Sequence, residues 1–187
     1  MFIKNLTNKF GYSEMYEWSE LFKYDIVPLG RFVTFAENEI GKIRLAKLSD
    51  RYIVGVTTIN TVCSSDCPLE WPGKYACNEY GDILIKERDK NDNTSPENFI
   101  NGIPVVPVIN PMYDDTKMYQ SRTDRVEWIN VNLIGKCIVE DNGECVPNGY
   151  CTYGNEGIAR PCTEAFPLSK YYVIDRISDH TILILLK

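Results

Sequence analysis

Short runs of β-branched and aromatic residues recur along the chain, and each run ends at Gly, Pro, Asn, Asp or Ser. This pattern predicts strands, because such side chains suit a pleated, half-buried surface and turn residues interrupt it. The predicted strands cover residues 31–35, 42–46, 52–57, 82–86, 105–109, 127–133, 136–140, 170–175 and 181–186. No window of about eleven residues keeps a helical period without Gly or Pro, and residues 19–23 are the best candidate for a short helix. The pattern therefore predicts an all-β fold.

The dipeptide Asn142-Gly143 lies between two apolar runs and is the strongest two-residue hairpin signal in the chain. In that hairpin Glu140 would face Cys145. Residues directly opposite each other share a face and faces alternate, so Cys137 and Cys145 would project to opposite sides of the ribbon. A disulfide between these two cysteines is therefore disfavoured, unless a bulge shifts the register.

Two stretches lack strand signals. Residues 87–101 are polar and predict a long surface excursion, of a length that suggests a role or mobility. Residues 110–120 carry two tyrosines and two methionines. Packing of a buried loop and a subunit contact would each explain these apolar groups.

The segment of residues 11–18, GYSEMYEW, is the most informative for chemistry. Read as a strand, it places Glu14 on one face together with Tyr12, Tyr16 and Trp18. A carboxylate among aromatic rings is a candidate for desolvation, which raises a glutamate pKa toward neutrality and makes the group a usable proton acceptor or donor. The plainer alternative is an exposed edge strand with Glu14 at its rim.

Ser13 offers a second, weaker chemistry on the same segment. Its hydroxyl could attack the preceding carbonyl and convert the Tyr12–Ser13 amide to an ester. That shift needs strain at the bond and a nearby acid or base, and Glu14 is adjacent in sequence.

The chain has 187 residues, of which 44% are hydrophobic, and a formal net charge of −6. These values predict one ordinary globular domain. Basic residues are scattered rather than gathered on a stripe, so nucleic acid is not an expected partner. No apolar run approaches the roughly 20 residues that span a bilayer, and the first residues do not form a signal peptide, so no membrane partner is expected.

A single histidine, His180, excludes most triads, dyads and multi-histidine metal sites, and its place in a polar stretch predicts a surface turn. The seven cysteines contain no C-x2-C pair, and no acidic cluster has the spacing of a calcium loop. Phosphate-binding glycine loops and the G-x-S-x-G turn are absent as well. We therefore expect no metal and no cofactor, and expect most cysteines to be small buried residues that are reduced during synthesis.

Ordered motifs run through nearly the whole chain. They are residues 12–18 (YSEMYEW), 30–34 (GRFVT), 52–57 (YIVGVT), 70–75 (EWPGKY), 78–81 (NEYG), 110–114 (NPMYD), 125–128 (RVEW), 133–136 (LIGK), 141–145 (DNGEC), 147–151 (PNGYC), 157–159 (GIA) and 182–187 (ILILLK). Together they resemble the C-terminal autoproteolytic intramolecular-chaperone domain of phage tail spikes and neck appendage proteins, a glutamic-type self-cleaving family whose opening motif is Y-A-E-x-F-E-W.

The resemblance implies a compact β-sandwich or barrel-like domain with long loops that forms a homotrimer at the end of an elongated virion fibre. Such a domain brings three chains into register and then cuts the chain ahead of its own first strand. In the family the cut falls at a Ser-Asp bond three residues before a glutamate that is taken to be catalytic. The matching residues here are Phe10, Gly11 and Glu14. Because neither partner of the Ser-Asp bond is present, self-cleavage is expected to be lost or weak.

We therefore interpret residues 1–10 as a leader or the remnant of an upstream linker, and residues 11–187 as a single β domain. The expected function is a virion-associated structural and trimerisation module, which is made in the host cytoplasm and contacts an upstream fibre or other virion proteins. One alternative is an active glutamic-type autoprotease that releases itself from an upstream spike. A further alternative, based on the many aromatic residues, is a receptor- or glycan-binding tip, which full burial of Trp71 and Trp128 would count against.

Overall fold

The computed structural model describes residues 11–19, 27–68, 70–89, 91, 98–163 and 169–187. Nearly all of the regular secondary structure in these residues is strand, which confirms the all-β prediction. Its helices are two single turns of 3-10 type, η1 (Arg122–Asp124) and η2 (Asn155–Gly157). The predicted leader, residues 1–10, lies outside the described residues, as does most of the short helix predicted over residues 19–23. None of the helices in the described ranges is long and apolar enough to cross a membrane.

The chain divides into two compact units. The first unit combines residues 1–67 with residues 122–187, and the second unit comprises residues 68–121. Each unit has its own sheet. The prediction of a single β domain over residues 11–187 stays a prediction.

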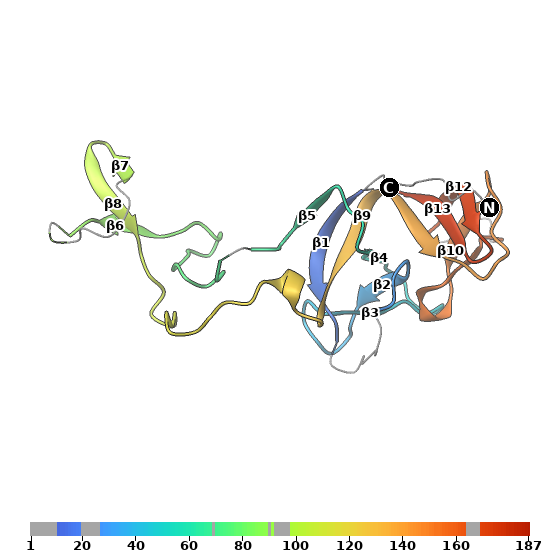
Figure 1. Cartoon of the computed structure of the whole chain (residues 1–187), viewed down its shortest axis with the longest axis horizontal. Coiled ribbons are helices and arrows are strands. Elements are labelled where there is room, and N and C mark those ends of the chain that lie inside the picture. Colours follow the sequence, from blue (N-terminus) through green and yellow to red (C-terminus); the bar gives the residue numbers. More distant parts are fainter. Residues whose placement is uncertain (1–10, 20–26, 69, 90, 92–97, 164–168) are drawn as a thin grey trace. The chain divides into compact units, whose positions relative to one another are not determined.

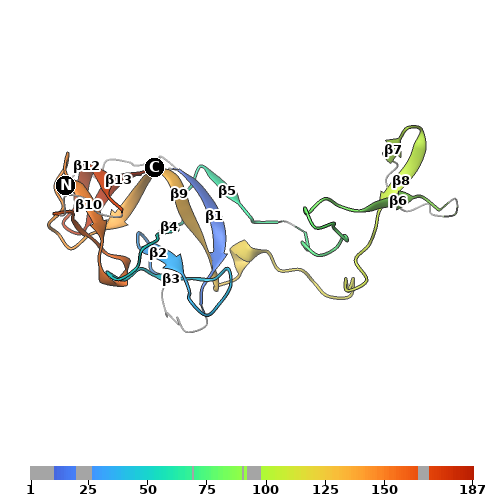
Figure 2. The same cartoon turned by 180° about the vertical axis from the view of Figure 1, so that it is seen from behind.

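The first unit is built on a ten-stranded sheet that curls into a half-barrel (Figure 1). Its strands are β1 (Tyr12–Glu17), β2 (Phe32–Phe35), β3 (Ile43–Leu45), β4 (Gly55–Thr58), β5 (Cys63–Ser65), β9 (Trp128–Glu140), β10 (Tyr150–Tyr153), β11 (Ala159–Pro161), β12 (Tyr171–Ser178) and β13 (Thr181–Leu186). Their order is β11-β10-β12-β13-β9-β4-β2-β3, and β1 pairs with β9 and β5. The long strand β9 is thus the element that joins the two halves of the sheet, as the view from behind also shows (Figure 2).

Strand β9 is one strand of 13 residues where the sequence predicts two. The glycine at position 135 interrupts the strand signal, so the sequence predicts one strand before it and one after it. In the structure the strand continues through Gly135, whose φ of +101° is a conformation that glycine adopts readily and other residues rarely do. Before Gly135, Ile129 and Val131 face one core; after it, Cys137 and Val139 face the other. In a regular strand all four odd-numbered residues would share a face, so Gly135 turns the strand over without ending it.

Two clusters of buried side chains form the cores of the first unit. The first core comprises Phe32, Ala46, Val56, Cys137, Val139, Cys145, Cys151, Tyr153, Ala159, Val173, Ile182, Ile184 and Leu186. The second core comprises Trp18, Val33, Ile43, Leu45, Val54, Ile129 and Val131. Only three of the seven cysteines are buried, all in the first core, so the expectation that most of them are buried is wrong.

The hairpin predicted at Asn142-Gly143 does not form. Strand β9 ends at Glu140 and pairs with β13 instead, and residues 144–146 are not in a strand. The apolar strand β13 offers β9 a partner over six residues, from Gly135 to Glu140, which a short return strand after Gly143 could not match. Cys137 and Cys145 therefore lie in the same core and not on opposite sides of a ribbon.

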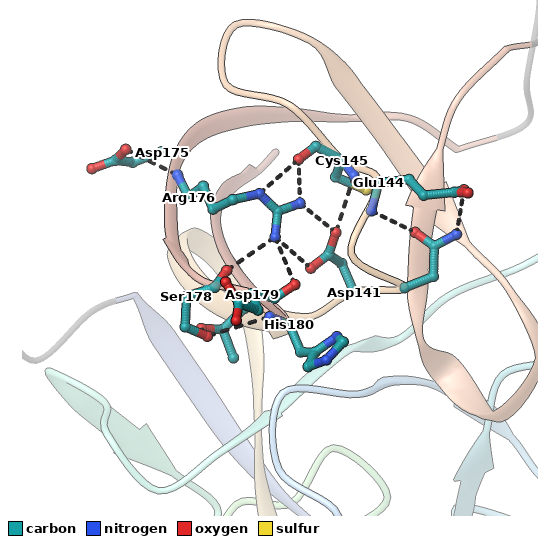
Figure 3. A network of polar contacts seen from close by, with 10 residues as sticks. Asp141, Glu144, Cys145, Asp175, Arg176, Ser178, Asp179 and His180 are labelled. Carbon is teal, nitrogen blue, oxygen red and sulfur yellow. Dashed lines mark hydrogen bonds and ion pairs between the residues drawn. The ribbon is translucent and has the colours of Figure 1, made fainter.

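An ion pair holds the segment that the sequence assigned to the hairpin (Figure 3). The Arg176 guanidinium lies 2.8 Å from Oδ2 of Asp141, whose side chain is completely buried. Arg176 also donates hydrogen bonds to the backbone carbonyls of Cys145, Ser178 and Asp179. The N–H of Cys145 donates to the same Asp141 carboxylate at 3.0 Å, so this one carboxylate fixes the chain after β9.

The second unit has a sheet of three short strands, β6 (Ile85–Glu87), β7 (Asn98–Ile100) and β8 (Ile103–Pro107), in the order β6-β8-β7. Strand β7 lies inside the stretch that the sequence predicts to be a strand-poor excursion. The tyrosines of residues 110–120 pack within this unit, because Trp71 contacts the rings of Tyr113 and Tyr119 at 6.4 and 6.0 Å between centroids.

Candidate functional site

Strand β1 carries the candidate residues, and it has neighbours on both sides. It runs antiparallel to β9 along its whole length and parallel to β5 over residues 12–14. The alternation predicted from sequence is present: Ser13 and Met15 are buried, while Tyr12, Glu14 and Tyr16 keep some exposure. The alternative of an exposed edge strand is wrong, because β5 covers the other side of β1 at Glu14.

The Glu14 carboxylate is held by two tyrosines of its own strand. The phenol of Tyr16 donates to Oε2 of Glu14 at 2.9 Å, and the phenol of Tyr12 lies 3.5 Å from Oε1. Tyr12 also donates to Oγ of Ser65 on β5 at 2.6 Å. Burial, and then the Glu14 carboxylate beside it, raise the pKa of Tyr16 far above its usual value, so this phenol stays a donor. Glu14 is thus a half-buried carboxylate that accepts hydrogen bonds on both oxygens.

A row of aromatic rings continues from this carboxylate. Tyr16 meets Phe35 edge-on at 6.0 Å between centroids, and Phe35 stacks on Tyr52 at 6.1 Å with the ring planes 10° apart. Phe35 and Tyr52 are 40% and 60% exposed. Rings that are stacked yet exposed offer a flat apolar surface next to a hydrogen-bond acceptor.

Ser13 lies on the other face of β1 and is completely buried. Its hydroxyl donates to the carbonyl of Cys63 and to Oδ1 of Asn130, each at 3.2 Å. Ser64 donates to the same Asn130 oxygen at 2.5 Å. These contacts tie β1 to β5 and β9, and the ester-forming role of Ser13 stays a prediction.

The chain enters β1 at Gly11 in a conformation that favours glycine, with φ of +68°. A Cβ at this position would lie 2.7 Å from the Ile134 carbonyl oxygen and 3.0 Å from the carboxamide of Asn132. Asn132 is itself buried, and its Oδ1 has no hydrogen-bond partner among the residues that the structure describes. The other half of the predicted cleavage region, Phe10, lies outside the described residues.

Sequence reasoning missed Ser65, Asn130 and Asn132. They come from β5 and β9, far from β1 in sequence, and no motif or spacing connects them to Glu14. The pairing of three strands brings them together. Only a prediction of strand order could have found them.

The other candidates lie elsewhere. His180 is exposed in the turn before β13, as its sequence context indicates. Within the described ranges, no group of three or more His, Cys, Asp or Glu residues could hold a metal ion. A cavity of about 540 Å³ in the first unit is lined by the loop after β2 and by Arg44 and Lys47, and it does not include Glu14.

The two tryptophans that bear on ligand binding are half-buried. The Arg122 guanidinium covers the ring of Trp128 at 3.9 Å from its centroid. Trp71 packs against tyrosines of the second unit. Neither is a free stacking platform, so the exposed rings beside Glu14 are the better candidates for that role.

The family model of the Peptidase_G2, IMC autoproteolytic cleavage domain matches residues 4–179. The chain belongs to this family. The Peptidase_G2 resemblance inferred from the motifs is thereby confirmed. The assignment of Glu14 to the catalytic glutamate of this family stays a prediction.

Several curated proteins are similar to this Peptidase_G2 chain. The pre-neck appendage protein of Bacillus phage B103 is 25% identical over 173 residues, which cover 89% of this chain and 19% of that protein. The pre-neck appendage protein of Bacillus phage phi29 is 26% identical over 168 residues, which cover 86% of this chain and 18% of that protein. The putative phage-related protein YobO of Bacillus subtilis is 29% identical over 156 residues, which cover 82% of this chain and 18% of that protein. The chain thus spans about a fifth of the length of these relatives.

Two solved structures share the fold. The pre-mature gene product 12 of bacteriophage phi29 superposes with a TM-score of 0.72 at 22% identity, covering 96% of this chain and 22% of that one. The C-terminal fragment of the same gene product superposes with a TM-score of 0.69 at 23% identity, covering 94% of this chain and 99% of the fragment. The second match therefore spans nearly the whole of that fragment.

Proposed function

We propose that the chain is a virion-associated structural module that holds three copies in register next to a spike or fibre, and that its self-cleavage is lost or weak. The observation that carries this proposal is the match to the Peptidase_G2 family over residues 4–179, together with the appendage proteins of Bacillus phages among its relatives. The expected partners are two further copies of this chain and an upstream fibre or other virion proteins.

The second unit supports self-association. Its three short strands leave Ile85, Phe99, Ile100 and Ile103 between 48% and 59% exposed. A sheet of this size is marginal by itself, and exposed apolar residues on it gain from being covered. Contact with other copies of the chain would supply that cover.

Gly11 supports the loss of cleavage. The resemblance implies an aspartate at the matching position, but the Asn132 carboxamide and the Ile134 carbonyl occupy the space that its side chain would need. An aspartate could not be added here without moving β9. The entry to β1 is thus built around glycine and not around the residue pair that the family cleaves.

Sedimentation velocity at micromolar concentration tests the trimer. We expect three times the 21.5 kDa mass of the chain. Phe99→Ser should shift the distribution toward the monomer, whereas Tyr80→Ser, at a residue of the same unit that is 83% exposed, should not. A monomer for the unaltered chain at these concentrations would overturn the proposal.

A specific observation also favours the second candidate function, an active autoprotease: two phenols hold the Glu14 carboxylate three residues after Gly11. Intact-mass spectrometry during long incubation distinguishes the two. A shortened chain that is absent in Glu14→Gln would establish self-cleavage, whereas a chain that stays full length in both supports the purely structural module.

The exposed rings of Phe35 and Tyr52 favour the third candidate, a glycan-binding tip. Binding of host-surface glycans that is weakened at least tenfold by Tyr52→Ala, and unaffected by Tyr80→Ala, would support it. If the chain binds no glycan on an array, the glycan-binding candidate is ruled out.

A further inference from the structure

Three Asn-Gly pairs occur in the chain, at residues 101–102, 142–143 and 148–149. An asparagine before glycine is prone to lose ammonia from its side chain in water, because glycine has no Cβ to shield its backbone nitrogen. That nitrogen must reach the asparagine carboxamide, so hydrogen bonds that hold either group slow the reaction. The structure therefore determines which of the three pairs can react.

The pair Asn148-Gly149 is held at both reacting groups. The phenol of Tyr172 donates to Oδ1 of Asn148 at 2.8 Å. The N–H of Gly149, which would be the attacking group, donates to the carbonyl of Val146 at 3.1 Å. Both hydrogen bonds would have to break before the two groups could meet.

The side chain of Asn142 is held by Glu144. Its Nδ2 donates to Oε2 of Glu144 at 2.6 Å, and its Oδ1 accepts from the N–H of Glu144 at 3.3 Å. The N–H of Asn142 also donates to the carbonyl of Ala159 at 3.0 Å. The carboxamide and the backbone of this asparagine are thus both fixed.

Asn101 and Gly102 form the exposed turn between β7 and β8. Their φ values are +51° and +80°, and positive values at both positions are what a two-residue hairpin turn of type I′ requires. A Cβ at Gly102 would meet no atom within 4 Å, so this side of the turn faces open space. Within the described ranges, neither the Asn101 carboxamide nor the Gly102 N–H takes part in a hydrogen bond.

The hairpin that carries this turn is short. Strand β7 pairs with β8 over three residue pairs and lies at the end of the sheet order β6-β8-β7. A small sheet of this kind is marginally stable, and its end opens at little cost in free energy. Opening lets the Asn101 side chain and the Gly102 nitrogen come together.

We propose that Asn101 is a site of spontaneous deamidation with water as the co-reactant. The Gly102 nitrogen bonds to the side-chain carbonyl carbon of Asn101, the bond from that carbon to Nδ2 breaks, and ammonia leaves with the proton of the Gly102 N–H. One water molecule then opens the cyclic imide at either of its two carbonyls and gives aspartate or isoaspartate. The proposal rests on the geometry of the second unit and does not depend on the proposed function.

The isoaspartate product changes the hairpin. It routes the main chain through Cβ and so adds one backbone atom to a turn whose length sets the strand register. Ile100 and Ile103, which pair directly across the turn, could no longer do so. The new carboxylate also lies beside these two isoleucines, each of which is 48% exposed. We therefore expect isoaspartate formation to release β7 from β8.

Peptide mapping after incubation of the folded, full-length chain at mildly alkaline pH measures the three sites in one sample. We expect Asn101 to convert at least about tenfold faster than Asn148, because two hydrogen bonds must break at Asn148 first. The same incubation in urea, with the chain unfolded, should bring the three rates together. The proposal is wrong if Asn101 stays intact in the folded chain or converts no faster than Asn148, or if the rates stay equally far apart in urea.

Tyr172→Phe provides a matched variant, because it removes the donor to the Asn148 carboxamide and leaves the hairpin unaltered. It should raise the Asn148 rate and leave the Asn101 rate unchanged. A rise at Asn101 as large as that at Asn148 would show that local contacts do not set the order, contrary to the proposal.

Amide hydrogen exchange measures the effect on the hairpin. The amides of Ile100 and Ile103 should be protected in the unconverted chain and exchange freely in the purified isoaspartate form. Asn101→Asp is the control, because it has the new charge without the extra backbone atom, and it should keep the protection. Protection that persists in the isoaspartate form would contradict the release of β7.

Discussion

Removing the positive partner of the buried Asp141 should destabilise the first unit strongly. We expect Arg176→Met, which keeps much of the aliphatic length of the side chain, to leave a completely buried carboxylate with the Cys145 N–H as its remaining partner among these contacts. Breaking a buried ion pair from one side costs about 3 to 5 kcal/mol. Because the Arg176 side chain is 26% exposed, water can reach the site, and we expect the lower end, about 3 kcal/mol.

The loss should depend on pH. Burial acts to raise the pKa of Asp141, but the hydrogen bonds from Arg176 and from the Cys145 N–H outweigh it and hold the pKa below its usual value. A lowered carboxyl pKa contributes stability that is present above the unfolded value, near 3.8, and disappears as the pH falls through the folded value. The difference between Arg176→Met and the unaltered chain should therefore be largest near neutral pH and shrink in acid.

Thermal and urea unfolding at several pH values measure this difference. For a chain of this size, a loss of 3 kcal/mol corresponds to a fall of roughly 6 to 12 °C in Tm. Arg51→Met, at an exposed residue of the same unit, is the control and should change stability by less than about 0.5 kcal/mol. A loss for Arg176→Met no larger than the control, or one that does not change between pH 7 and pH 3, would refute the reasoning.

Two further predictions follow from backbone geometry and burial. Gly157→Ala should lower the free energy of unfolding by at least about 2 kcal/mol, because φ is +66° and a Cβ would lie 2.3 Å from the Phe32 carbonyl oxygen. Gly41→Ala is the control, because its φ is +77° but a Cβ would meet open space, and it should cost only about 1 kcal/mol. Urea unfolding measures both losses. Burial raises the pKa of Tyr171 to about 12, so stability that is complete below pH 10 should fall by about 3 kcal/mol at most as the pH approaches 12. Tyr171→Phe should flatten this alkaline decline, and an unchanged decline would contradict the assignment.

Most strands of the first unit were predictable, because they are short β-branched or aromatic runs with turn residues at their ends. Strands β5, β10 and β11 were not predicted, and the sequences of β5 (CSS) and β11 (ARP) carry no such run. The pairing of the strands was not predictable. Asn142-Gly143 has the composition of a hairpin turn, and Gly143 does adopt a positive φ of 91°, yet the partner of β9 is the distant strand β13. A local turn signal describes the backbone at two residues and carries no information on which strand pairs beyond them.

The candidate site was predictable within β1 and not beyond it. The period of two places Tyr12, Glu14 and Tyr16 on one face, and the structure joins all three by hydrogen bonds. Ser65 enters through a parallel pairing, whose register no hairpin fixes. The tight approach of Gly11 to β9 is equally invisible in sequence, because it depends on the bulge where Tyr12 and Ser13 change register against β9.

The chemistry of the proposed site and the stability of the fold are separable in this chain. Glu14 belongs to neither buried core, whereas Ser13 and Met15, on the other face of β1, are buried against its neighbours. A change at Glu14 should therefore leave β1 anchored through Ser13, Asn130 and the pairing with β9. A domain with this division can keep a structural role with or without self-cleavage, because the strand that carries Glu14 is also a structural strand of the half-barrel.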